Sequence, residues 1–570
     1  MQEKTTEKPK LNRILKGSRV AGIDSMAISD GIDSLDLMKN AGEGISRKIF
    51  QDYKDSGLKR SPRGVIVCGG GNNGGDGFVA ALGLLELGYN IKTFHIVPSG
   101  KFSQDSSHYY EKLVGKAGDT VMALDLKDDE SKKKFLNELA VSDFVLDAIF
   151  GTGFHGMEIR GQARKIISLI NSEREKRSDI VIYSVDIPSG VDSDNGKVPG
   201  TAVKADKTIT FGCKKVGNIN FPGAGYNGRI SIIDIGIPGK YYCQHEQIFE
   251  PEFEWVAEKI PKRKPWTYKH NVGRLLIVAG SVGYTGAATM ACLGALRSGA
   301  GLVTLACPES LNPVFEQKLT ETMTFPVAET ESGSLHFDSL EDILDLSKEA
   351  DALVIGPGIS REASTMHLVR ELLKKADIPV ILDADGLQAL CGPHDIEKGG
   401  DNKIIEMIIT PHPGELSSIM GIEKIKLEER IEINEEASRR FGAVSVLKGA
   451  RTVISNAADI PLKNGDQEKK AECASGSVRT DMTTTYINPT GNWGMASAGT
   501  GDILAGIIGS LVCQGMKLLE AAVCGTYIHG LSADIISKKT SKTSLIATDL
   551  LEGLKEVFLN IEKIKYKKEK

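Results

Sequence analysis

Residues 65 to 77 read VIVCGGGNNGGDG, an apolar run followed by a loop with six glycines, two asparagines and an aspartate. Residues 78–88, FVAALGLLELG, then have the apolar composition of a helix. Glycine costs conformational entropy, so a cluster is kept where the backbone bends sharply or approaches a ligand closely. The stretch predicts a strand, a glycine loop and a helix. Backbone amides of such a loop suit a phosphate, and the NNGGD side chains also suit a cation or ribose hydroxyls.

Length and composition exclude several classes of protein. The 570 residues are too many for one core, so we expect two or more domains. The chain has 70 Lys and Arg residues and 75 Asp and Glu residues, a net charge of −5. It therefore lacks the excess of basic residues that is typical of nucleic-acid-binding proteins. The nine cysteines form no CxxC motif, which favours a reducing, cytoplasmic location without disulfides. The opening MQEKTTEKPK lacks the apolar core of a secretory signal, and Arg297 interrupts the apolar stretch 287–307, so we expect no membrane span.

Short β-branched runs alternate with amphipathic segments through both halves of the chain. Examples are IKTFHIV, IVIYSVDIPSG and KTITFG in the first half, and RLLIVAGS, LVTLACP and ALVIGPG in the second. Continuous apolar runs are typical of strands buried on both faces, so each half is predicted to be an α/β domain with a mainly parallel sheet. The pattern dissolves into polar and charged residues around 239–264, where we expect the linker.

Three further stretches of the first half carry polar residues at predicted strand ends. Asp147 leads into AIFGTGFHG, Asp186 lies in VDIPSGVD, and GKVPG spans residues 196–200. Because ligands of an open parallel sheet bind outside the carboxyl ends of its strands, these stretches and the glycine loop can converge on one cleft. Each carboxylate alone is more often a cap or a surface residue than part of a site. Together they favour a binding site.

Residues 487–515, INPTGNWGMASAGTGDILAGIIGSLVCQG, carry the strongest single motif of the second half. A strand ends, a glycine-containing loop follows, and AGTGD begins an apolar helix. Backbone N–H groups of residues 498–501 at a helix N-terminus can hold developing negative charge, and Asp502 can take a proton beside them. Phosphoryl transfer to an alcohol needs both features. The alternative is an aspartate that merely stabilises the first helical turn.

The motifs of the first half resemble, in order and spacing, the epimerase domain of NAD(P)H-hydrate repair enzymes. The resemblance covers about residues 20–240 and implies a Rossmann-like doubly wound sheet. It also implies a K⁺ ion held by Asn73, Asp147 and Ser189, whose oxygens suit a hard cation. The residues that would contact the damaged nucleotide are Asn72, Asn73, Gly74, Gly75, Asp76, Gly151, Thr152, Gly153, Phe154, His155, Gly156, Met157 and Asp186.

GTGD in the second half resembles the ribokinase-like superfamily. The stretches VIGPG, LDADGL, ITPHPGE and LKGART narrow the resemblance to the dehydratase domain of the same repair system, over roughly residues 262–560. Trp493 and Tyr268 depart from the family, which usually has proline and histidine there. The hydrate would contact Ala287, Gly358, His412, Pro413, Gly414, Glu415 and Asp502. The adenine nucleotide would contact Lys448, Gly449, Ala450, Arg451, Thr452, Asn492, Gly494, Met495, Ala496, Ser497, Ala498, Gly499, Thr500 and Gly501.

The resemblance implies repair of hydrated NADH or NADPH by a bifunctional isomerase and lyase. The first domain would interconvert the R and S epimers at C6, with Asp186 as a candidate group for the proton. The second would phosphorylate the C6 hydroxyl of the S form from ADP or ATP, with Asp502 as base, and eliminate phosphate. The fused chain favours ADP. We expect K⁺, Mg²⁺ with the nucleotide, small-molecule substrates, no nucleic acid, no membrane, and a homo-oligomer.

Other readings stay open at this point. GTGD also serves kinases that phosphorylate vitamin-like alcohols and release a stable product. The first domain can be a non-catalytic nucleotide-binding scaffold. An ordinary NAD-dependent dehydrogenase is the weakest alternative, because the chain lacks GxGxxG.

Overall fold

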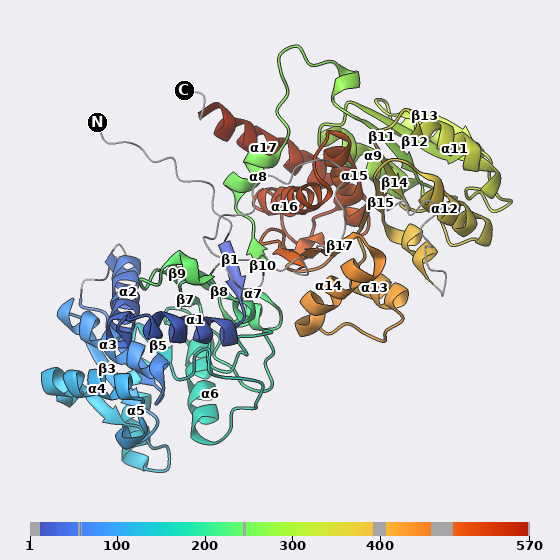
Figure 1. Ribbon diagram of the computed structural model, residues 1–570. Coiled ribbons are helices and arrows are strands. Elements are labelled where there is room, and N and C mark those ends of the chain that lie inside the picture. Colours follow the sequence, from blue (N-terminus) through green and yellow to red (C-terminus); the bar gives the residue numbers. More distant parts are fainter. Residues whose placement is uncertain are drawn as a thin grey trace. The chain divides into compact units, whose positions relative to one another are not determined.

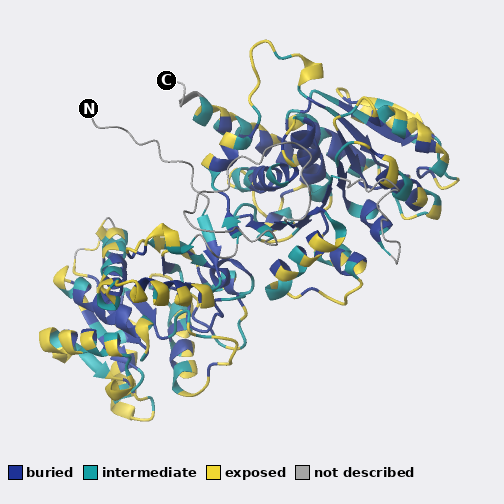
Figure 2. Ribbon diagram, viewed as in Figure 1, coloured by how far each residue is buried: buried dark blue, intermediate teal, exposed yellow. Residues whose placement is uncertain are grey.

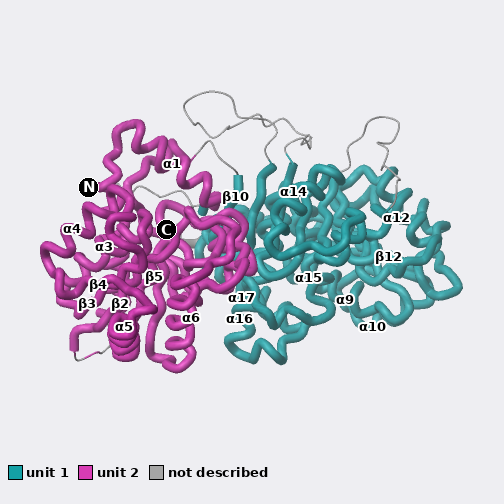
Figure 3. The backbone as a smooth tube through the Cα atoms, turned by 90° about the horizontal axis from the view of Figure 1, so that it is seen from below, with its two compact units in different colours: residues 1–12, 247–470, 477–570 teal, residues 13–246, 471–476 magenta. Residues whose placement is uncertain are grey.

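The computed structural model describes residues 12–54, 58, 60–242, 247–391, 406–457 and 483–567. These residues fall into two compact units, coloured separately in Figure 3. The N-terminal unit covers residues 13–242, and the C-terminal unit covers Asn12 and residues 247–567. We describe each unit by itself.

The N-terminal unit is built on a parallel sheet with the strand order β4-β3-β2-β5-β6-β7-β9. The chain runs outward from β2 through β3 to β4, then returns to β5 on the other side of β2 and continues through β6, β7 and β9. The strand order therefore reverses between β2 and β5, where open α/β sheets bind ligands. The strands are β2 (Arg63–Cys68), β3 (Asn90–His95), β4 (Val121–Ala123), β5 (Phe144–Ala148), β6 (Val181–Val185), β7 (Lys207–Phe211) and β9 (Arg229–Ile233).

Helices cover both faces of this sheet because each strand buries both of its faces. Ile66 and Cys68 of β2 belong to one apolar cluster, and Val65 and Val67 belong to another. The first cluster includes residues of α1 to α4, and the second includes residues of α5 and α6 (Figure 1). The helices are α1 (Gly17–Ser29), α2 (Ser34–Lys54), α3 (Asn72–Glu86), α4 (Gln104–Ala117), α5 (Asp129–Val141), α6 (Gly161–Lys176) and α7 (Val216–Ile219). The short strands β1 (Asn12–Leu15) and β8 (Lys214–Lys215) pair in parallel.

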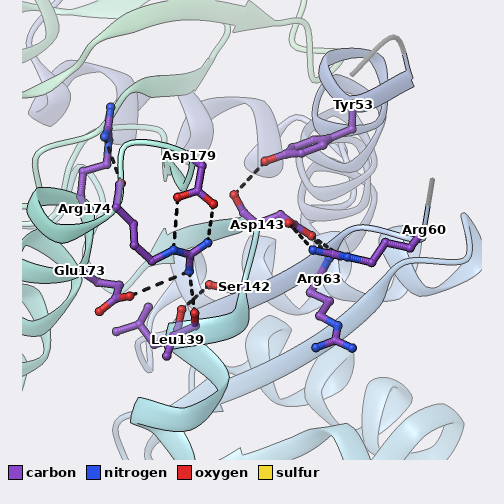
Figure 4. A network of polar contacts seen from close by, with 11 residues as sticks. Tyr53, Arg60, Arg63, Leu139, Ser142, Asp143, Glu173, Arg174 and Asp179 are labelled. Carbon is purple, nitrogen blue, oxygen red and sulfur yellow. Dashed lines mark hydrogen bonds and ion pairs between the residues drawn. The ribbon is translucent and has the colours of Figure 1, made fainter. Parts of the chain in front are cut away.

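Polar contacts tie the amino ends of β2 and β5 together (Figure 4). Asp143 accepts two hydrogen bonds from the Arg60 guanidinium at 2.7 and 2.8 Å and one from the Arg63 backbone N–H at 2.7 Å. The Tyr53 hydroxyl donates to the Asp143 carbonyl at 3.0 Å. Although burial raises the pKa of Asp143, Arg60 outweighs it and holds that pKa below its usual range. The glycine loop therefore lies at the opposite, carboxyl edge of the sheet.

The C-terminal unit is built on a mixed sheet with the order β13-β12-β11-β14-β15-β16-β17-β18-β19-β10. Neighbouring strands are parallel from β13 to β17, β18 is antiparallel to both of its neighbours, and β10 is parallel to β19. The strands are β10 (Gln247–Glu250), β11 (Arg274–Val278), β12 (Leu302–Pro308), β13 (Met323–Val327), β14 (Ala352–Ile355), β15 (Val380–Leu382), β16 (Met407–Ile409), β17 (Val444–Leu447), β18 (Val453–Asn456) and β19 (Thr484–Ile487).

Apolar helices form the core on one face of this sheet, with α9, α15, α16 and α17 in one cluster with Leu275 and Ile277 (Figures 1 and 2). On the other face the Ser445 hydroxyl of β17 donates to Asn434 of α14 at 2.7 Å. The helices are α8 (Phe253–Lys259), α9 (Thr285–Arg297), α10 (Asn312–Lys318), α11 (Leu340–Ser347), α12 (Ala363–Lys375), α13 (Pro413–Met420), α14 (Arg430–Phe441), α15 (Thr500–Cys513), α16 (Leu518–Ile536) and α17 (Ala547–Lys567).

The predicted fold class is confirmed, and the predicted strands of both halves are present. The boundary between the two units lies within residues 239–264, where we expect the linker. The later part of that segment is not a linker, because it forms β10 and α8 of the C-terminal unit. Trp255 and Val256 of α8 are buried in the C-terminal core, although the surrounding charges hide them in the sequence. Each cysteine that the structure describes is a free thiol. Among the described residues, no helix combines the length and the apolarity needed to cross a membrane.

Glycine at position 77 is required by close packing. A Cβ atom there would lie 2.7 Å from the Ala148 Cβ and 2.8 Å from the Cys68 Sγ, whereas a Cβ at Gly71 would meet nothing within 4 Å. We expect Gly77→Ala to destabilise the N-terminal unit by about 1–3 kcal/mol, because α3 would have to move off β2 and β5. Denaturant unfolding measures the loss. Gly71→Ala is the control, and an equal loss in both variants would contradict the packing argument.

Candidate active sites

The glycine loop lies where the strand order of the N-terminal sheet reverses. It follows β2, but α3 begins at Asn72, so the second part of the predicted loop, residues 72–77, forms the first turns of the helix. A Cβ atom at Gly69 would lie 2.0 Å from the Ile149 carbonyl oxygen, and one at Gly74 would lie 2.2 Å from the Gly69 carbonyl oxygen. Gly69 lets the end of β2 approach the residue after β5, and Gly74 lets the first turn of α3 pack on Gly69. A Cβ atom at Gly151, in the loop after β5, would lie 2.7 Å from Asn73 Oδ1. The predicted residues after β2 and β5 are therefore brought together.

The second predicted loop, residues 151–157, is fastened to the loop after β6. The Ser193 hydroxyl donates to the Thr152 carbonyl at 3.1 Å, and the Gly156 N–H donates to Asp192 at 2.9 Å. His155 lies 3.9 Å from Asp194. The loops after β2, β5 and β6 thus form one continuous rim, as the sequence predicts. Met157, at the end of the predicted range, is exposed.

Asp186 is held at the end of β6 in a left-handed backbone conformation, with φ at 63°. Such a conformation costs energy in a non-glycine residue and is typical of functional sites. Its Oδ1 accepts hydrogen bonds from the Thr210 hydroxyl at 2.8 Å and from the Lys215 ammonium. Lys215 is fully buried and also donates to the Phe211 carbonyl at 3.0 Å. The prediction missed Lys215, which reads as one more charge in FGCKKVG.

Two more carboxyl groups lie close enough to this ion pair to interact with its charges. Asp76 is 9 % exposed, and burial together with the charges of Asp186 and Asp24 raises its pKa well above the usual range. Burial raises the pKa of Asp24, in α1, to about 6; Lys215 lowers it and Asp186 raises it. Three carboxyl groups therefore share one buried lysine, and a group that titrates near neutral pH is suited to proton transfer.

Asp147 and Ser189, two of the predicted K⁺ ligands, lie in contact. Asp147 is fully buried and accepts from the Ser189 hydroxyl at 2.6 Å, the Ser189 N–H at 2.9 Å, the Ser184 hydroxyl at 2.9 Å and the Ile149 N–H at 3.2 Å. Four donors fill the lone-pair positions of a carboxylate. Asn73, the third predicted ligand, has a buried amide nitrogen without a hydrogen-bond partner among the described residues.

In the C-terminal unit, Asp502 lies in the first turn of α15, and Gly499 caps this helix with φ at 89°. Burial raises the pKa of Asp502 to about 7; the charge of Asp383 adds to the shift and that of Lys448 opposes it. Helix α15 therefore begins beside a carboxyl that ionises near neutral pH, and the N–H groups of its first turn have no acceptor within the helix. This is the arrangement the GTGD motif predicts.

A buried ion pair lies beside Asp502. The Lys448 ammonium, at the end of β17, is 2.7 Å from the Oδ1 of Asp383, at the end of β15, and 3.8 Å from Glu415. Burial lowers the pKa of Lys448, but Asp383 and Glu415 outweigh this and raise it. The Oδ2 atom of Asp383 is buried without a hydrogen-bond partner among the described residues. LDADGL contributes to the resemblance, but the prediction did not name Asp383 as a site residue.

Several residues predicted to bind ligands also hold the loops together. The His412 Nδ1 accepts from the N–H groups of Gly414 and Glu415 at 3.0 and 3.2 Å, so His412 caps α13. The Asn492 amide donates to Asp534 of α16 at 2.8 Å. A Cβ atom at Gly358 would lie 3.1 Å from the Ala287 Cβ, so these two predicted hydrate contacts are neighbours.

The predicted nucleotide turn after β17 is held by Arg430, which the prediction missed. Arg430 is buried at the start of α14 and donates to the carbonyls of Leu447 at 3.1 Å, Lys448 at 3.2 Å and Ala450 at 2.5 Å. Arg451 in this turn has a φ of 56°. The acidic stretch before α14 makes Arg430 look exposed in the sequence.

Comparisons with known proteins identify the family of this chain. Residues 34–217 match the family model described as "YjeF-related protein N-terminus", and residues 275–483 and 477–556 match "NAD(P)H-hydrate dehydratase". A curated protein of Moorella thermoacetica named "Bifunctional NAD(P)H-hydrate repair enzyme Nnr" is 37% identical over 555 residues, which cover 96% of this chain and 97% of that protein. The chain belongs to this family of bifunctional repair enzymes. The predicted family and enzyme class are confirmed.

Other members of the family are also similar along their length. The Nnr protein of Thermofilum pendens is 35% identical over 92% of both chains. Among solved structures, the ADP/ATP-dependent NAD(P)H-hydrate dehydratase of Bacillus subtilis, co-crystallised with ATP and Mg²⁺, is 29% identical with a TM-score of 0.44, and covers 54% of this chain and 97% of its own.

Proposed function

We propose that this member of the family repairs hydrated NADH and NADPH in two steps, one in each unit. The N-terminal unit interconverts the R and S epimers at C6. The C-terminal unit dehydrates the S form at the expense of ADP or ATP. Support comes from the match along nearly the whole length of bifunctional relatives and from an acid with a raised pKa beside a buried Lys–Asp pair in each unit.

In the C-terminal unit, Asp502 is proposed to remove the proton of the C6 hydroxyl while the phosphoryl group is transferred to that oxygen. The backbone N–H groups at the start of α15 face the developing negative charge. The turn Lys448–Thr452, held by Arg430, binds the nucleotide together with residues 494–501. Residues 412–415 with Gly358 and Ala287 hold the hydrate. The ring nitrogen then expels phosphate, which is a far better leaving group than hydroxide.

Mg²⁺ fits this proposal as a partner of the nucleotide phosphates. The described residues form no group of three or more His, Cys, Asp or Glu side chains suited to a metal. Mg²⁺ commonly uses one or two carboxylates together with substrate phosphates and water. Asp502 and the unpartnered Oδ2 of Asp383 are the carboxylate oxygens at hand. When bound, the cation would neutralise charge on the phosphates.

In the N-terminal unit, Asp186 is proposed to handle the proton while the hydroxyl leaves C6 and water returns on the other face. Residues 72–76 and 151–157 bind the nucleotide around it. The oxygen chemistry of Asn73, Asp147 and Ser189 suits K⁺, but the Ser189 hydroxyl would have to turn away from Asp147 to bind it.

A homo-oligomer and a cytoplasmic location are also part of the proposal, and sedimentation velocity and cell fractionation test them.

The function is tested with Asp502→Asn and separated epimers. We expect dehydration of the S form to fall about 10²–10⁴-fold, because a general base contributes that much. In the wild type, kcat/KM should rise with pH through about 7, since only the ionised carboxylate accepts a proton, and the rise should vanish in the variant. Near-ultraviolet absorbance reports the restored dihydronicotinamide, and a phosphate assay reports the leaving group.

Asp549→Asn is the matched control, because Asp549 occupies the first turn of α17 in the same unit. It should keep the wild-type rate. Full turnover by Asp502→Asn would contradict the assignment of the base. A stable phosphorylated product without free phosphate would instead identify a kinase.

The K⁺ proposal predicts that replacing K⁺ by choline lowers the rate of epimer interconversion but not dehydration of the S form. Asn73→Ala should raise the K⁺ concentration needed for half-maximal epimerisation, because one oxygen ligand is lost. Asn90→Ala is the control, since Asn90 is exposed at the amino end of β3 and belongs to none of the proposed binding loops. Epimerisation that is independent of the monovalent cation would show that Asp147 and Ser189 only brace the loop.

A further inference from the structure

Helix α1 covers the rim of the N-terminal site. The Ser18 N–H donates to Asp194 in the loop after β6 at 2.8 Å. A Cβ atom at Gly17 would lie 2.0 Å from the Ser193 Oγ and 3.3 Å from the Thr152 Cβ. Val20 and Ile23 are buried in the cluster that also contains Leu146 of β5 and Val185 of β6. The helix is thus fastened over the loops proposed to bind the substrate.

Asp24 is the acidic residue that α1 brings to the site. It is half-buried, and its Oδ1 is buried without a hydrogen-bond partner among the described residues. A buried carboxylate oxygen without a partner is costly, and a protonated carboxyl in the same place costs less because it carries no charge. The side chain therefore has a reason to carry a proton rather than a full charge.

The titratable groups that interact with Asp24 come from several elements of the N-terminal unit. Asp186 after β6 and Lys215 of β8 act on it directly, and Asp24 in turn acts on Asp76 of α3. The remaining groups are Cys213 after β7, which also feels Arg13 of β1, and Tyr242 near the end of the unit. Lys215 is bonded to Oδ1 of Asp186, so the carboxylate beside Asp24 is fixed in position.

We propose that Asp24 stores the proton that is exchanged with the C6 hydroxyl during epimerisation, acting through Asp186, which Lys215 holds in place. This inference rests on the proposed epimerase function. The proton moves to the C6 oxygen, the C6–O bond breaks, and the hydroxyl leaves as water while the ring nitrogen lone pair forms a C=N bond. Water then adds to the opposite face, a new C6–O bond forms, and one proton returns to Asp24.

Asp24 thus acts through Asp186 and does not contact the substrate itself. The form needed to start the reaction carries the proton. Since burial raises the pKa of Asp24 to about 6, this form is lost as the pH rises above that value. The kcat/KM of epimerisation should therefore fall as the pH rises above about 6.

The test measures interconversion of the separated epimers by the full-length chain without ADP or ATP, with an enzyme-free blank subtracted at each pH. We expect Asp24→Asn to lower kcat/KM about 10²–10⁴-fold and to abolish the fall above about 6. Asp24→Glu, which keeps a carboxyl, should retain a fall with a displaced midpoint. Asp36→Asn, at an exposed position of α2, is the control and should match the wild type.

An unchanged pH profile in Asp24→Asn would overturn the inference, whatever the rate of the variant. Loss of a residue with only a structural role would not remove the fall of kcat/KM at high pH. If Asp24→Asn does not fold, judged by loss of the unfolding transition of the N-terminal unit in denaturant, Asp24→Glu decides. A displaced midpoint of the pH-dependent fall then supports the inference, and an unmoved midpoint overturns it. Asp186→Asn distinguishes a failure of the proposed epimerase site from a failure of the proposed role of Asp24. Full epimerisation by that variant would refute the proposed site itself, whereas its inactivity beside an unaffected Asp24→Asn refutes only the role of Asp24.

Discussion

A buried ion pair between a lysine and an aspartate at the end of a strand organises each unit. In the N-terminal unit the pair is Lys215 with Asp186, and in the C-terminal unit it is Lys448 with Asp383. Taking these charges out of water is costly, and leaving one of them unpaired costs about 3–5 kcal/mol. Each pair therefore fixes its loops, because any movement that separates the partners exposes a charge to an apolar interior.

The same pairs set the chemistry of the neighbouring acids. Asp24 and Asp502 each lie near one positive and more than one negative charge and are partly shielded from water. Burial and the carboxylates favour the protonated acid, and the lysine opposes them. The balance leaves both acids with pKa values of about 6 and 7, where a carboxyl can both give and take a proton. A lysine alone would keep them ionised, and burial alone would keep them neutral.

The sequence predicts the parts of this arrangement that depend on backbone. Glycine loops after apolar runs mark the carboxyl ends of β2 and β5, and GTGD marks the start of α15, because those residues are needed by local geometry. Lys215, Arg430 and Asp24 were missed because their importance comes from neighbours far along the chain. His412 and Asn492 show the reverse, since their motif suggests ligands while their side chains cap a helix or bind α16.

The two proposed steps need opposite protonation states. Epimerisation begins with a proton on Asp24, a form that declines above about 6, and dehydration needs ionised Asp502, which develops through about 7. Starting from the R form, both units must work in sequence, so flux through the whole chain is limited by the first acid at high pH and by the second at low pH. Between the two pKa values each required form is the minority one, and the product of the two fractions is greatest there. Because Asp24 must be protonated and Asp502 ionised, the fused chain loses least flux when the pKa of Asp24 does not lie far below that of Asp502.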